Sequence, residues 1–229
     1  MNLRADHIYH TFLRLTRRLS NSQIMMLLAV VVGVLAGVGT YLFEMLLYGI
    51  KYGLTNWFPV DSAHILFLIY PAVGIILATL FVKYIVRDNI SEGVTRVLYA
   101  MSSRNSRIAG HNCWTSIVGG ATTIGFGGSV GPEAPIVLTG AAIGSNVGRI
   151  ARLNYKHPPL LLCCGAGAAL AAIFKAPITG VVFVLEILML DITAGSVIPL
   201  LIASITATTM AFMLRGYDTI LAVTLAPAD

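Results

Sequence analysis

Gly-Phe-Gly-Gly-Ser-Val-Gly-Pro-Glu-Ala-Pro, residues 125–135, interrupts the apolar sequence of this chain and leads into the small-residue run 136–150. Glycine and proline end one helix here. Pro132 suits the first position of the next helix, because the N–H that proline lacks would have no partner there. The free N–H groups and the positive end of the helix dipole favour an anion at such a helix start. Within a membrane, irregular backbone is tolerated only where protein buries it or water reaches it.

Glu133 falls in the first turn of this expected helix, where a negative charge is favoured. An ionisable side chain inside a membrane is a candidate functional residue by default. The carboxylate could occupy the anion position itself, and leave it when it is protonated or displaced. The sequence therefore predicts an anion gate at Glu133.

The composition indicates an integral membrane protein built of helices. Of the 229 residues, 57% are hydrophobic and 11% are charged, whereas soluble domains carry about 25% charged residues. At roughly 20 residues per membrane span, about nine apolar segments fit, and several are too short to cross alone. The net charge of +5 comes from basic residues at segment ends, which indicates membrane orientation rather than nucleic-acid binding.

Three regions are expected along the chain. Residues 1–22 mix arginine with apolar residues, which predicts an amphipathic helix on the cytoplasmic face, with a disordered basic tail as the alternative. Residues 23–216 hold the membrane segments, and residues 217–229 form a tail with little pattern. No cleavable signal peptide is visible. We therefore expect a cytoplasmic N-terminus and residence in the plasma, or inner, membrane.

Apolar runs bounded by glycine, proline and charge predict the helices of residues 23–216. They are expected at 23–48, at 65–86 with an interruption at Pro71 and Gly74, from about 91 to 103, and at 108–127, 132–150, 158–174, 177–190 and 195–214. Residues 56–61 are expected in an interfacial loop. The four-residue spacing of Gly140, Gly144 and Gly148 predicts close packing by another helix.

Other polar residues suggest little further chemistry. Glu44, near the end of the first span, is expected to be a solvated charge at the membrane rim. Cys113, Cys163 and Cys164 lie in apolar segments without metal-ligand spacing, so neither a metal nor a cofactor is expected. No zinc-protease pattern, nucleophile elbow or catalytic carboxylate pair occurs, so enzymatic function is the weakest of the hypotheses.

With these residues considered, the chain resembles the first half of the membrane domain of the CLC family of chloride channels and chloride/proton exchangers. Residues 131–135, Gly-Pro-Glu-Ala-Pro, match the family's Gly-Arg-Glu-Gly-Pro loop. Residues 174–177, Phe-Lys-Ala-Pro, match its Phe-Asn-Ala-Pro helix start. The resemblance implies an all-α fold of broken and tilted helices, the first of two inverted repeats. It also implies a voltage-gated chloride channel with its gate at Glu133, working as a homodimer or with a complementary second half.

The resemblance places an anion site at two helix starts. The matched positions are Ser91, Glu92, Gly93, Gly131, Pro132, Ala134 and Pro135. Aligned on Gly93, this chain has Glu92 where the family has a serine. Either Ser91 supplies the hydroxyl after a shift of one residue, or the central site and its selectivity are altered.

A second departure concerns proton coupling. Many exchangers of the family carry two adjacent glutamates at the end of the Phe-Asn-Ala-Pro helix. Here Glu186 matches the first, and Ile187 replaces the second, which serves as the inner proton acceptor. Passive conduction is therefore favoured, although Glu186 or Glu92 could act as a substitute proton relay. Glu186 is alternatively a structural residue that pairs with Lys175 or faces water. The alternatives are a proton-coupled chloride or fluoride exchanger, and a non-conducting half that assembles with a partner.

Overall fold

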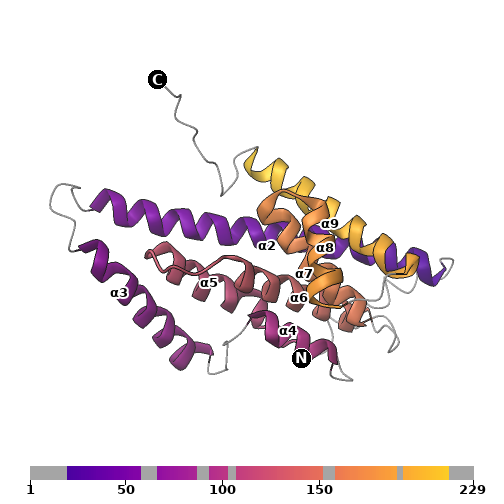
Figure 1. Ribbon diagram of the computed structural model, residues 1–229, viewed down its shortest axis with the longest axis horizontal. Helices are drawn as coiled ribbons and strands as arrows, with labels where there is room; N and C mark the ends of the chain where they lie inside the picture. Colours follow the sequence, from indigo (N-terminus) through magenta and orange to yellow (C-terminus); the bar gives the residue numbers. More distant parts are fainter. Residues whose placement is uncertain are drawn as a thin grey trace, which may run out of the picture.

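The computed structural model describes residues 20–57, 66–86, 93–102, 107–151, 158–189 and 193–216, and all regular structure in these ranges is helical (Figure 1). The helices are α2 (Asn21–Trp57), α3 (Leu66–Phe81), the π-helical turn η2 (Val82–Val86), α4 (Gly93–Ser102), α5 (Asn112–Gly125), α6 (Glu133–Ile150), α7 (Pro158–Phe174), α8 (Pro177–Ile187) and α9 (Ala194–Arg215). The expected all-α fold is confirmed.

The helices differ in their capacity to cross a membrane. Within the described ranges, three stretches are long and apolar enough to span it: Ser22–Leu54, Ile69–Val86 and Ala194–Arg215. The apolar helices α7 and α8 are shorter. The expected mixture of spanning and short segments is therefore present.

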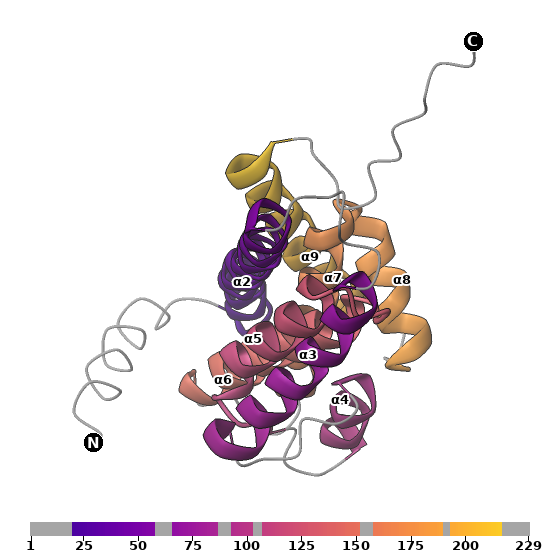
Figure 2. The ribbon, with the colours of Figure 1, turned by 90° about the vertical axis from the view of Figure 1, so that its left-hand side faces the viewer.

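Helix α7 forms the centre of the fold. Every residue from Leu161 to Ile173 is buried, and α7 packs against α2, α6, α8 and α9. In the end-on view of Figure 2, α7 lies between α2, α8 and α9. Small residues make this possible, since a Cβ on Gly165 would collide with the carbonyl oxygen of Gly140, and one on Gly140 with that of Gly165. The predicted role of the α6 glycines in close packing is confirmed at Gly140 and Gly144.

Several expected boundaries were wrong. Helix α2 continues to Trp57, so Asn56 and Trp57 belong to its last turn rather than to a loop. Helix α3 is not interrupted at Pro71, which lies inside it. Proline removes only one N–H donor, and inside a membrane protein neighbouring helices compensate for such a loss. Gly74 lies close to Phe126 at the end of α5, because a Cβ on Gly74 would come within 2.5 Å of the Phe126 Cβ.

Helix α6 begins at Glu133, with Pro132 as its N-cap, one residue later than expected. The predicted amphipathic helix of residues 1–22 lies outside the described residues up to position 19, and Asn21 already belongs to α2. The predicted tail, residues 217–229, also lies outside them.

Candidate functional site

The starts of α4 and α6 meet. Gly93 is the first residue of α4, and its Cα lies against the backbone of Ala134 in the first turn of α6. A Cβ on Gly93 would come within 2.9 Å of the Ala134 carbonyl carbon and closer still to its oxygen. Only glycine allows this approach, which brings the positive ends of two helix dipoles to one place.

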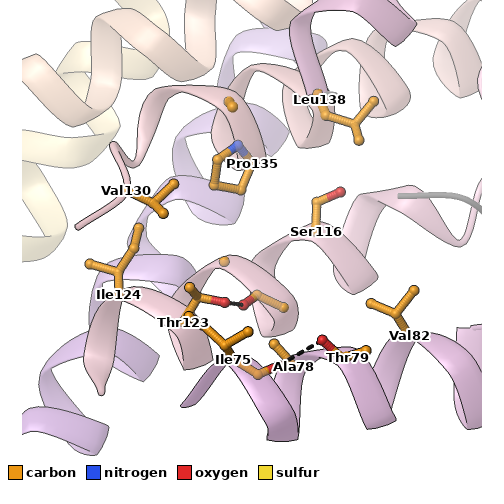
Figure 3. Close-up of a pocket in the computed structure, with 14 residues that line it drawn as sticks. Ile75, Ala78, Thr79, Val82, Ser116, Thr123, Ile124, Val130, Pro135 and Leu138 are labelled. Atoms are coloured by element: carbon orange, nitrogen blue, oxygen red, sulfur yellow. Dashed lines mark hydrogen bonds between the residues drawn. The ribbon is translucent and has the colours of Figure 1, made fainter. Parts of the chain in front are cut away.

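A cavity of about 500 Å³ opens beside this junction (Figure 3). Helices α3 and α5 form most of its wall, and the remaining lining residues are Val82, Gly93, Val130, Ala134, Pro135 and Leu138. The wall from α3 is held against α5 by an edge-to-face contact between Phe81 and Trp114, whose ring centres are 6.1 Å apart. None of the described residues that line the cavity carries a charge. An anion there would be attracted by backbone dipoles rather than by a basic side chain.

Glu133 lies at the start of α6, just outside this cavity. It is exposed, and its carboxylate folds back over Gly131, where a Cβ would collide with Oε2. No side chain caps α6, and within the described ranges Glu133 makes no hydrogen bond or ion pair. Within the described ranges no hydrogen bond or ion pair therefore fixes the carboxylate in this rotamer. Its role as a gate stays a prediction.

The other predicted site residues divide into three groups. Gly93, Ala134 and Pro135 line the cavity. Gly131 and Pro132 precede α6 in the chain and are not part of the wall. Ser91 and Glu92 lie outside the described residues, so the question of which of them supplies a hydroxyl stays open.

Glu186, the candidate proton relay, lies apart from the cavity. It is exposed on α8, a helix that packs on α7 and α9. Within the described part of the chain it forms no ion pair with Lys175. Lys175 instead donates a hydrogen bond to the carbonyl oxygen of Gly216 at 2.6 Å. The expected exposure of Glu186 is therefore confirmed, and the expectation that it pairs with Lys175 is wrong.

The expectation that Glu44 is a solvated rim charge was wrong. Glu44 is 5% exposed, and its Oε2 accepts a hydrogen bond from Arg215 Nη1 at 2.8 Å. The Arg215 guanidinium also lies 3.8 Å from the centre of the Tyr48 ring. The two charges are 171 residues apart in the chain, so no local sequence pattern could have joined them.

Sequence reasoning also missed Ser116 on α5. This residue is buried, lines the cavity, and its Oγ has no hydrogen-bond partner among the described residues. A single serine in an apolar helix is usually a packing residue. The available signal was Gly119, one turn further along α5, where a Cβ would meet no atom within 4 Å.

The family model and the curated relatives that match this chain belong to the same group of proteins. A family model described as voltage gated chloride channel matches residues 74–228. The chain is 29% identical over 160 residues to a putative chloride channel protein ClcB-like of Ralstonia nicotianae, covering 68% of this chain and 37% of that protein. It is 35% identical over 172 residues to the H(+)/Cl(−) exchange transporter ClcA of Vibrio vulnificus, covering 69% of this chain and 35% of that protein.

Two solved structures match most of the chain. A CLC-type fluoride/proton antiporter gives a TM-score of 0.70 at 30% identity, covering 90% of this chain and 50% of that one. A slow cyanobacterial Cl−/H+ antiporter gives a TM-score of 0.71 at 23% identity, covering 88% and 49%, and at that identity the likeness shows the fold alone. The chain thus spans about half of these structures and 35–37% of the two curated relatives.

Proposed function

Because the chain belongs to the voltage-gated chloride channel (CLC) family, we propose that it carries chloride across a membrane along a path past the starts of α4 and α6. The observation that carries this proposal is the contact of Gly93 with Ala134 beside a cavity without charged walls. Backbone N–H groups at the two helix starts would replace part of the hydration shell of the anion. Chloride is the cargo, and neither a cofactor nor a catalytic step belongs to the proposal.

Glu133 is proposed as the gate of this path. Its carboxylate sits at the uncapped start of α6, without a partner in the described part of the chain to hold it there. As a tethered anion it would compete with chloride for the same dipoles. Protonation or displacement would remove this competition and admit the free ion.

Passive conduction is proposed ahead of exchange, because Ile187 cannot carry a proton and Glu186 lies away from the cavity. Exchange is the second candidate. The matched Vibrio vulnificus relative is named an H(+)/Cl(−) exchange transporter, and one matched structure is titled a fluoride/proton antiporter.

Assembly is part of the proposal, since the matched structures are about twice as long as this chain. A second copy or a complementary chain would supply the remaining wall of the path. The location proposed is the plasma, or inner, membrane with a cytoplasmic N-terminus.

The test is simultaneous recording of chloride efflux and external pH from liposomes that contain the 229-residue chain. Efflux without proton movement would support a channel, and efflux with opposing proton movement would support an exchanger. Glu133→Gln should increase efflux and abolish its pH dependence, whereas Glu186→Gln, a control that is also exposed but lies on α8, should keep the wild-type profile. An unchanged pH profile in Glu133→Gln would refute the gate. Absence of efflux in all variants would refute transport by this chain alone.

A further inference from the structure

Ser116 presents an unused hydroxyl to the cavity. It is 2% exposed, and its Oγ lacks a hydrogen-bond partner within the described ranges. In Figure 3 the hydroxyl projects from α5 toward the side of α6 that carries Pro135 and Leu138. Buried polar groups are nearly always hydrogen-bonded, so an orphan of this kind indicates an occupant that the protein itself does not supply.

The other hydroxyls nearby are already used. Thr79 Oγ1 donates to the Ile75 carbonyl oxygen at 2.7 Å, and Thr123 Oγ1 to that of Gly119 at 3.0 Å. Both residues line the cavity. On α5, Thr115 and Thr122 likewise bond the carbonyl four residues earlier. Ser116 could bond its own helix in the same way, yet its Oγ has no partner among the described residues.

The surroundings determine which occupant fits. The first turns of α4 and α6 bring two positive dipole ends to the cavity, and none of its described lining residues is acidic. A hydroxyl can donate to an anion and thereby complete a set of donors. A volume of about 500 Å³ is large for a bare halide, since one water occupies about 30 Å³. The anion would therefore keep part of its hydration.

We propose that Ser116 is an anion ligand, donating a hydrogen bond to a halide held between the first turns of α4 and α6. This inference rests on the proposed transport of chloride. It goes further by assigning a residue of α5 to binding, so that α5 contributes a specific donor as well as packing.

The test is isothermal titration of sodium chloride and sodium fluoride into the purified 229-residue chain, in a buffer whose only anion is large and organic. Ser116→Ala should weaken halide binding roughly tenfold or more, as expected for loss of a hydrogen bond to a charged group. Thr122→Val is the control on the same helix, because its hydroxyl is bonded to Val118 away from the cavity wall. Ser204→Ala removes another unpartnered buried hydroxyl, on α9. Both controls should bind within twofold of wild type.

Circular dichroism and melting temperature establish that each variant is folded. Equal halide affinity in Ser116→Ala and wild type would overturn the assignment, as would an equal loss of affinity in Thr122→Val or Ser204→Ala. The liposome measurement separates the two proposals. Transport by the wild type together with undiminished binding by Ser116→Ala overturns the Ser116 assignment alone, whereas a wild type that neither binds nor transports halide overturns both.

Discussion

Replacing Arg215 with methionine should strongly destabilise the protein, because it leaves the Glu44 carboxylate buried without its partner. The Glu44 side chain is 6% exposed and the Arg215 side chain is 21% exposed. Breaking a buried ion pair costs about 3–5 kcal/mol, and the partial exposure of Arg215 favours about 3 kcal/mol. Loss of the guanidinium over the Tyr48 ring adds about 1 kcal/mol. We expect a decrease of about 4 kcal/mol in the free energy of unfolding, measured by titrating micelles of the chain with sodium dodecyl sulfate.

Arg149→Met is the matched control. Arg149 is exposed and bonds only Asn146 Oδ1 among the described residues, at 2.9 Å, so its loss should cost less than about 1 kcal/mol. Adding Glu44→Gln to Arg215→Met should restore part of the stability, because the unpaired charge is then removed. If Arg215→Met and Arg149→Met cost the same, the inference that the Glu44 charge depends on Arg215 is refuted.

Glycine substitutions give three further predictions. Gly93→Ala should lower chloride affinity in calorimetry with an unchanged helical signal, since its Cβ would push α4 away from Ala134; unaltered affinity would show that the two helix starts need not touch. Gly165→Ala should lower the free energy of unfolding by about 1–3 kcal/mol, because its Cβ collides with the Gly140 backbone. An unchanged free energy of unfolding would contradict the backbone contact. Gly49→Ala, in a helix with open space around it, should stabilise by up to about 1 kcal/mol, and a loss of stability there would reveal an unrecognised contact.

Local chemistry explains what could be predicted from the sequence. Prolines at 158 and 177 mark helix starts to the residue, and Pro132 lies one residue before the start of α6, at its N-cap. Lys175 has a positive φ of 53° and separates α7 from α8 where the sequence predicts a break. These features depend on a few neighbouring residues, whose steric limits do not change with the rest of the fold.

Long-range contacts explain the failures. Pro71 does not interrupt α3, because packing on α5 offsets one lost hydrogen bond. Glu44 is buried beside Arg215, which lies on α9, far away in the sequence. Whether the Ser116 hydroxyl has a hydrogen-bond partner depends on the helices that surround the cavity. Such properties depend on contacts between segments that are distant in the sequence, and local sequence patterns do not show these contacts.

The buried helix α7 has a consequence for how the chain assembles in lipid. Between lipid tails the hydrophobic effect gives helices little reason to associate, so association depends on dispersion forces at short range. Residues 165–169 of α7 are Gly-Ala-Gly-Ala-Ala, and glycine and alanine lose no side-chain rotamer entropy when they are packed. This stretch of α7 therefore packs at a low cost in side-chain entropy, because none of its residues has a rotamer to fix.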